Sequence, residues 1–149
     1  MALDIDLVLV AVDGSDESQR AAERAVALAE RYGADLHLLH FVDNRIMDGI
    51  KAGDLSKDTI AKEQQALTDA IRSKLPDDDS VDFTFSAATG FSTTKLGQTP
   101  GIVILDVAEE LDADFLVVPR ETPTGDPDEV VGKAAFQVLE YASQPVLSV

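Results

Sequence analysis

Two basic residues, Arg120 and Lys133, flank a loop that follows a short apolar run and leads into a helical pattern. Nucleotide-binding α/β proteins often hold phosphates in such a loop, because the backbone amides at the start of a helix carry partial positive charge. Arginine and lysine side chains can add charge-assisted hydrogen bonds to a phosphate. The loop between residues 119 and 133 is therefore the first candidate for a ligand site.

The helix after this loop can begin at either of two places. Asp126 and Pro127 fit an N-cap followed by a first-turn proline. A helix that starts there contains Gly132 and Lys133, whose amides are then tied up in helical hydrogen bonds and lost to a phosphate. A helix that starts near Gly132 instead leaves Arg120 and Lys133 able to contact a phosphate by charge.

Other catalytic and metal-binding patterns fail on their spacing. A P-loop in this region would need glycine where Pro127 stands, and Ser or Thr where Ala134 stands. His37 and His40 lie three apart on an expected strand, so they point to opposite faces and cannot share a metal ion. Ser15 has no histidine recognisably placed to activate it, and is expected to cap a helix. We therefore expect no metal and no covalent catalysis.

Strand and helix patterns alternate along the chain, which predicts an α/β fold in a single domain over residues 1–149. The fold class is a doubly wound, five-stranded parallel sheet with helices on both faces. The expected strands are Leu7–Val12, Asp35–Val42, Val81–Ser86, Phe115–Val118 and Pro145–Val149. The first expected helix follows Ser15 and ends at Gly33, and the second runs from about Ser56 to the stop at Pro76. The third begins at Thr99 and buries a stripe of Val103, Val107, Ala108 and Leu111. The fourth runs from Ala134 to Ala142.

The order of these elements also indicates where a ligand would bind. In an open parallel sheet, ligands lie at the carboxyl ends of the strands, where the winding direction reverses. Asp13, Val42 and Arg120 lie at or just after the ends of the first, second and fourth expected strands. The polar segment from Thr89 to Gln98 shows neither a helical nor a strand period, and is a candidate lid or ordered surface loop.

Composition narrows the classes of function. The 149 residues include no cysteine, which excludes a disulfide framework and favours a cytoplasmic location. The net charge of −16 repels phosphate backbones and anionic lipids, so we expect no nucleic-acid and no membrane partner. Asp4 and Asp6 interrupt the apolar opening, so we expect neither a signal peptide nor a membrane span. Because the acidic residues are spread along the chain, they favour the salt-tolerant cytoplasm of a halophile.

Three stretches of the chain resemble the universal stress protein family. They are Val10–Ser18, Ile104–Val118, and Gly132 followed by the closing Gln144–Val149. They occur in the order and at the spacing of the family, and the resemblance covers nearly the whole length of the chain apart from residues 89–98. The resemblance implies a Rossmann-like fold of the adenine nucleotide alpha hydrolase type and a cytoplasmic role in the stress response.

The resemblance also implies self-association and other protein partners, whose identity the sequence does not give. Members of this family often form homodimers through the last strand. Here Val146, Leu147 and Val149 would form an apolar edge of the sheet, a surface that proteins usually cover. We therefore expect a homodimer that acts as a binding module.

The phosphate-binding motif of the family is altered in this chain. Its ATP-binding members carry Gly, two residues, Gly, nine residues, then Gly followed by Ser or Thr. That spacing falls on Pro119, Thr122, Gly132 and Lys133. Pro119 has no N–H to offer, and Thr122 adds a side chain where room is needed. We expect a degraded loop without a bound cofactor; the alternative is ATP or AMP held by Arg120 and Lys133, with weak ATPase activity.

The adenine end of the family's site is better preserved. Asp13 and the two residues before it match positions that frame the base in ATP-binding relatives, although Asp13 can equally be a turn residue that caps the first helix. Val42 and Val118 would supply apolar walls. The candidate nucleotide-contacting residues are Ala11, Val12, Asp13, Val42, Val118, Pro119, Arg120, Thr122, Gly132, Lys133 and Ala134.

Overall fold

The computed structural model describes residues 4–13, 15–42, 51–53, 58–75, 80–88, 99–120 and 134–149. The candidate lid at residues 89–98 and the candidate site residues Thr122, Gly132 and Lys133 lie outside these ranges. The described elements are β1 (Leu7–Val12), α1 (Asp16–Tyr32), β2 (Asp35–Phe41), α3 (Asp58–Arg72), β3 (Phe83–Ala88), α4 (Pro100–Glu110), β4 (Phe115–Val118), α5 (Ala134–Tyr141) and β5 (Val146–Ser148).

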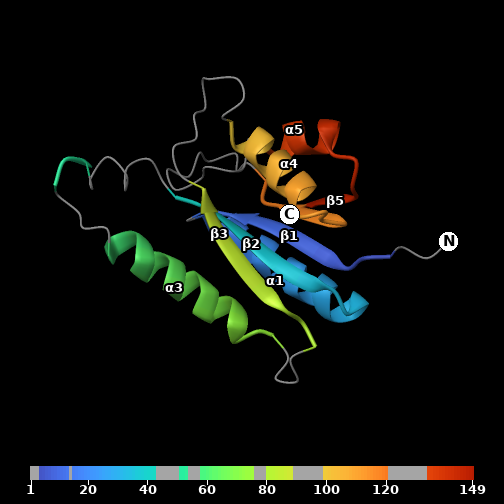
Figure 1. Ribbon diagram of the computed structural model, residues 1–149, viewed down its shortest axis with the longest axis horizontal. Helices are drawn as coiled ribbons and strands as arrows, with labels where there is room; N and C mark the ends of the chain where they lie inside the picture. Colours follow the sequence, from blue (N-terminus) through green and yellow to red (C-terminus); the bar gives the residue numbers. More distant parts are fainter. Residues whose placement is uncertain are drawn as a thin grey trace.

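The five strands form one parallel sheet in the order β3-β2-β1-β4-β5. Helices α1 and α3 cover one face of the sheet, and α4 and α5 cover the other (Figure 1). The predicted fold class is therefore confirmed. The chain leaves β1 toward β2 on one side and later returns to β4 on the other, so the winding direction reverses between β1 and β4.

The continuous apolar run of β1 reflects its burial on both faces. Val8 and Val10 pack into the cluster beneath α1 and α3, whereas Leu9 and Ala11 pack into the cluster beneath α4 and α5. Successive side chains of a strand point to opposite faces, so a central strand with two covered faces needs apolar residues at every position. β1 supplies this central position, with β2 and β4 hydrogen-bonded on its two sides.

The ends of α1 follow the predicted capping pattern. The Ser15 hydroxyl accepts a hydrogen bond from the Ser18 amide, and Asp16 and Glu17 occupy the first turn. Gly33 ends the helix in the left-handed conformation at φ 62°, and its amide donates to carbonyl oxygens of the last turn. The predicted caps of the first helix are thus confirmed.

Two expected strand boundaries are wrong in detail. The third strand runs over Phe83–Ala88 rather than Val81–Ser86, because its register with β2 pairs Leu36 with Phe83 and Phe41 with Ala88. Pairing with a neighbouring strand thus overrides the low strand propensity of alanine. The second strand ends at Phe41, one residue earlier than expected.

The buried stripe of α4 also differs from the expected one. Ile104 is 1% exposed and Ala108 is buried with it, whereas Leu111 is 38% exposed. Leu111 is the C-cap of the helix, beyond its last full turn, and therefore no longer faces the sheet. Val103 and Val107 pack only at the margin of the core.

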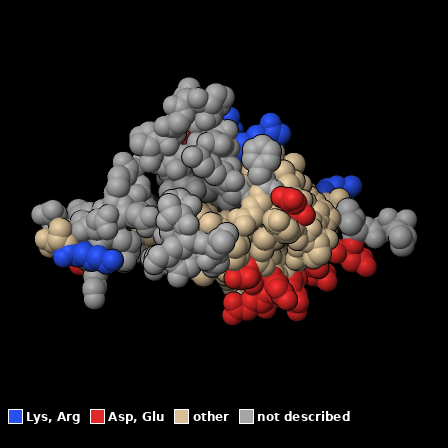
Figure 2. Space-filling model, turned by 90° about the horizontal axis from the view of Figure 1, so that it is seen from above, with Lys and Arg blue, Asp and Glu red and all other residues tan. Residues whose placement is uncertain are grey.

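The surface of the described residues is dominated by acidic side chains. Seen from above, Asp and Glu side chains gather along one margin, whereas Lys and Arg side chains lie apart from one another (Figure 2). No helix in the described ranges combines the length and the apolar character that crossing a bilayer requires.

The two histidines face opposite sides of the sheet, as predicted. The two ring nitrogens of His37 lie 2.7 Å from the Thr84 hydroxyl and 2.9 Å from the Ser86 hydroxyl, both on β3. His40 lies on the other face, where its Nδ1 is 2.8 Å from Oε1 of Gln64 on α3. Burial lowers the pKa of His37 below the ordinary value of 6.5.

This shift gives the fold a defined dependence on pH. Between the lowered native pKa of His37 and 6.5, the unfolded chain binds a proton that the native chain does not. The contribution of His37 to the free energy of unfolding is fully present above pH 6.5, and it is lost as the pH falls from 6.5 through the lowered native pKa. We expect His37→Asn, which keeps a hydrogen-bonding side chain, to lose less unfolding free energy than the wild type between about pH 7.5 and about pH 5. Urea denaturation at both pH values measures the difference, and equal losses in the two proteins would refute the assignment.

Candidate functional site

Seven of the candidate residues lie at the carboxyl ends of the central strands, whereas Ala134 begins the described part of α5. Val10 pairs with Val117, so the ends of β1 and β4 reach the same edge of the sheet at the point where the winding reverses. On the other side of β1, Val12 pairs with His40, and Val42 follows β2 at this edge. The buried members of the set are Ala11, Val12, Asp13, Val42, Val118 and Pro119, whereas Arg120 is exposed.

These apolar residues do not all face one crevice. Ala11 and Val118 belong to the cluster beneath α4 and α5. Val12 belongs to the cluster beneath α1 and α3, on the opposite face of the sheet. A ligand at this edge can therefore contact the backbone of all three residues, but apolar side chains on one face only. Strand alternation alone places Ala11 and Val12 on opposite faces, and the structure adds which helices cover each face.

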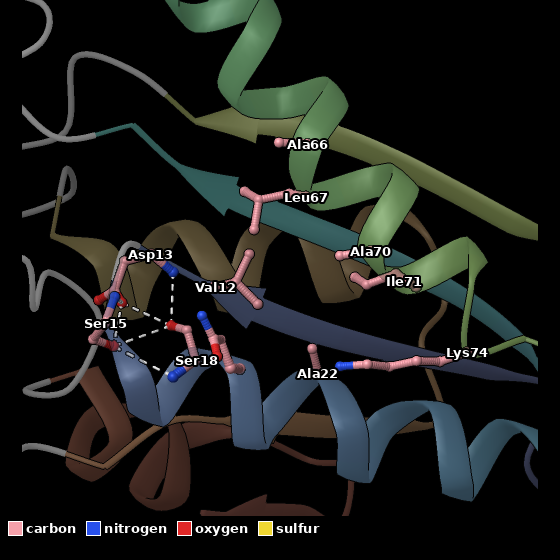
Figure 3. A pocket seen from close by; sticks show the side chains of 11 residues that line it. Val12, Asp13, Ser15, Ser18, Ala22, Ala66, Leu67, Ala70, Ile71 and Lys74 are labelled. Carbon is pink, nitrogen blue, oxygen red and sulfur yellow. Dashed lines mark hydrogen bonds between the residues drawn. The ribbon is translucent and has the colours of Figure 1, made fainter.

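The Asp13 carboxylate holds the turn between β1 and α1. Its Oδ1 accepts hydrogen bonds from the Ser15 amide at 2.9 Å and from the Ser18 hydroxyl at 2.7 Å, and also from the Ser15 hydroxyl (Figure 3). The Asp13 amide donates in return to the Ser18 hydroxyl oxygen at 2.7 Å. With Asp13 only 3% exposed, these contacts make it a buried turn residue, as one of the two alternatives from the sequence had it, whereas the cap of α1 itself is Ser15.

Ser15 and Ser18 complete this buried network. Each hydroxyl has one proton, and the short contacts to Asp13 indicate that both protons go to the carboxylate. The Ser15 oxygen then remains available to accept from the Ser18 amide at 3.3 Å, which caps α1. Sequence analysis missed Ser18, although the spacing Asp13, Ser15, Ser18 at the start of a helix is a detectable signal.

The backbone after β4 is paired with β5 instead of pointing into a loop. Pro119 has no amide proton, and the Arg120 amide donates to the Val149 carbonyl at 2.7 Å. The Val149 amide donates to the Val118 carbonyl at 2.9 Å. The first two residues after β4 therefore offer a phosphate no unpaired backbone amide. The Arg120 side chain is exposed and is not constrained in this way.

The described part of α5 begins at Ala134. Because residues 121–133 lie outside the described ranges, the two possible starts of this helix both stay open. Among the described residues, no group of three or more His, Asp or Glu side chains is placed to hold a metal ion.

A polar contact between α4 and α5 was also missed from the sequence. The Thr99 hydroxyl donates to Oε1 of Gln137 at 3.0 Å, so it makes no capping bond to its own helix. A Cβ added to Gly101 would collide with the same Gln137 side chain. Glycine at this position therefore lets the start of α4 approach α5 closely, which fixes both helices against the β1 and β4 side of the sheet.

Comparison with known proteins gives one consistent family. The sequence pattern of the Universal stress protein family matches residues 5–149. A universal stress protein of Methanocaldococcus jannaschii is 26% identical over 145 residues, which covers 95% of this chain and 80% of the relative.

Solved structures of universal stress proteins share the fold. One, described in complex with cAMP, superimposes with a TM-score of 0.63 at 20% identity and covers 98% of this chain and 97% of its own. Another, from Archaeoglobus fulgidus and described in complex with dAMP, has a TM-score of 0.59 at 19% identity and covers 99% and 98%. At this identity, the likeness shows the fold.

The Asp13 network predicts the cost of losing its carboxylate. Asp13→Ala leaves the Ser15 and Ser18 donors without their acceptor in a buried turn, so we expect a loss of about 1–3 kcal/mol in unfolding free energy. Asp16→Ala is the matched control, because it removes an exposed acid one residue into the same helix. Urea denaturation compares the two variants, and equal small losses would show that the network is not stabilising.

Proposed function

Because the chain belongs to the universal stress protein family, we propose that it is a cytoplasmic stress-response module that acts by binding. It recognises protein partners and pairs with a second copy, without covalent catalysis and without strong dependence on a nucleotide. The observation that carries this proposal is the pairing of the Arg120 amide with the Val149 carbonyl, next to a proline that has no amide.

This pairing opposes a triphosphate site after β4. A triphosphate needs several backbone or side-chain donors converging on it, and glycine-rich loops provide them by leaving amides unpaired. Here the sheet uses the one amide that residues 119 and 120 have between them. The positions that would restore the family's motif are Pro119, Thr122 and Lys133, where the ATP-binding members carry Gly, Gly, and Ser or Thr.

A second candidate function is the binding of an adenosine monophosphate. It is favoured by two structural neighbours described in complex with cAMP and dAMP. The base end of the site supports it, because Asp13, Val42 and Val118 lie buried at one edge of the sheet. A single phosphate also needs fewer donors, and the exposed Arg120 side chain together with Lys133 would neutralise it by charge.

Nucleotide titration separates the two candidates. We expect ATP to give no calorimetric heat and no stabilisation of the wild type. A ligand that binds, at about 100 times its Kd, would add about 2.7 kcal/mol to the unfolding free energy, so binding would be detected. The triple variant Pro119→Gly, Thr122→Gly, Lys133→Ser should gain ATP binding by restoring the glycines and the hydroxyl. Isothermal titration and thermal melting with ATP and AMP measure both proteins.

The matched control is Pro123→Gly, which loosens the same loop outside the motif and should gain nothing. Stabilisation of the wild type by AMP but not by ATP would favour the second candidate. Micromolar ATP affinity of the wild type would overturn the first candidate and with it the interpretation of the altered loop.

Self-association through β5 is the second part of the proposal. β5 is an edge strand of the sheet, paired on one side with β4, and Leu147 is 36% exposed on it. On the neighbouring helix α5, Leu139 is 50% exposed and Tyr141 is 67% exposed. An edge strand beside exposed apolar side chains is a surface that proteins usually cover, and a second copy would cover both.

The charge of the chain makes this pairing sensitive to salt. Two copies with a net charge of −16 each repel one another, and salt screens that repulsion over about 10 Å at 0.1 M and about 3 Å at 1 M. We propose that the acidic surface suits the salt-rich cytoplasm of a halophile, in which the repulsion between copies is screened.

Light scattering at low salt and in molar KCl tests the pairing. We expect the wild type to be dimeric in molar KCl, with a weaker dimer at low salt, and Leu147→Asp to be monomeric in both because it places a charge in the interface. Tyr32→Asp is the control, since it puts the same charge on an exposed apolar side chain at the end of α1, on the face of the sheet opposite to α5. An intact Leu147→Asp dimer would contradict the interface, and a salt-independent dimer would contradict the role of charge.

A further inference from the structure

A groove of about 420 Å³ lies between α1 and α3, on the face of the sheet opposite to α4 and α5 (Figure 3). Val12 of β1 contributes to its floor, and the groove extends from the Asp13 turn toward Lys74, just beyond the end of α3. Its volume falls in the range of about 300–1,000 Å³ that is typical of small-molecule sites. All of its lining residues belong to the described part of the chain.

The groove exists because small residues face one another across it. Ala22 lines it from α1, and Ala66 and Ala70, one turn apart, line it from α3. Protein interiors are usually packed without such gaps, and larger side chains at these positions would fill the space. Ala66 and Ala70 are exposed, so the groove is open to solvent and a ligand can enter it without a rearrangement of the helices.

The two ends of the groove differ in their polarity. At one end, Asp13, Ser15 and Ser18 make hydrogen bonds to one another, so an apolar group placed beside this trio breaks none of those bonds. At the other end, the Lys74 ammonium lies across the groove, 3.4 Å from Oε1 of Glu23 on α1 (Figure 3). Both of these side chains are largely exposed, and such an ion pair contributes little and is readily exchanged.

We propose that this groove binds a linear aliphatic monocarboxylate. The carboxylate pairs with Lys74 in exchange for Glu23, and the alkyl chain lies along the alanines toward the Asp13 turn. Ala66 and Lys74 are eight residues apart, which corresponds to about 12 Å along the helix and to an alkyl chain of about eight to ten carbons.

The charges around the groove favour a single carboxylate over other head groups. Lys74 is the one basic residue among those that line the groove, and the chain as a whole carries a charge of −16. Phosphates with several negative charges would meet this repulsion with a single partner. A neutral alcohol would fill the apolar part but would leave Lys74 with Glu23. The groove shares Val12 and Asp13 with the carboxyl edge of the sheet, but the proposal does not rest on the proposed nucleotide or partner functions.

Titration with decanoate, below the concentration at which it forms micelles, tests the site. We expect saturable one-to-one binding to the wild type by isothermal titration. Ala70→Leu should abolish it by filling the groove, whereas Ala61→Leu, the same change at an exposed alanine of α3 outside the lining, should leave it unchanged. Urea denaturation of both variants confirms that they are folded.

Charge variants test the head group. Lys74→Gln should weaken decanoate binding by about two- to fivefold, as expected for an exposed ion pair, and Glu23→Gln should strengthen it by removing the competing anion. Neither change should affect the binding of decanol, which should be weaker than that of decanoate in the wild type. Equal binding of the two ligands, equal behaviour of the two alanine variants, or no saturable binding would each overturn the proposal.

Discussion

The buried carboxylate of Asp13 fixes the part of the molecule on which both candidate sites depend. It joins the end of β1 to the first turn of α1 through the Ser15 amide and the hydroxyls of Ser15 and Ser18. The direction in which α1 leaves the sheet follows from this turn, and one wall of the α1–α3 groove lies along α1. The carboxyl edge of the sheet begins at the same residue, so this network sets the geometry of both sites.

A second constraint acts at the other side of the carboxyl edge. Sheet pairing and phosphate binding would both use the backbone amides that follow β4. In this chain the Arg120 amide is hydrogen-bonded to Val149, beside β5. Proline at position 119 fits that outcome, because the amides that donate to the β5 side are those of Leu116 and Arg120, so the missing N–H removes no bond from this pairing. The edge strand β5 is thereby extended as far as Val149, which connects the altered loop with the surface proposed for self-association.

Local patterns were sufficient to predict β1, α1 and β4, whereas long-range contacts were not readable from the sequence. The caps at Ser15 and Gly33 depend on a few neighbouring residues, and the continuous apolar run of β1 predicts a central strand that is buried on both faces. The start of β3 depends instead on its register with β2, and the exposure of Leu111 depends on where α4 ends against the sheet. Nothing near Gln137 in the sequence indicates that it meets Thr99.

The same division explains what was predictable about the sites. The sequence correctly placed the candidate residues of the strand ends at the carboxyl edge, because alternating strands and helices predict a parallel sheet, whose strands all end at one edge. It could not show which helices cover the faces on which Val12 and Ala11 lie, nor that alanines on α1 and α3 leave a groove. The groove and the carboxyl edge share Val12 and Asp13, but their apolar walls lie on different faces. The two sites meet at the β1–α1 turn, where the Asp13 carboxylate accepts hydrogen bonds from Ser15 and Ser18.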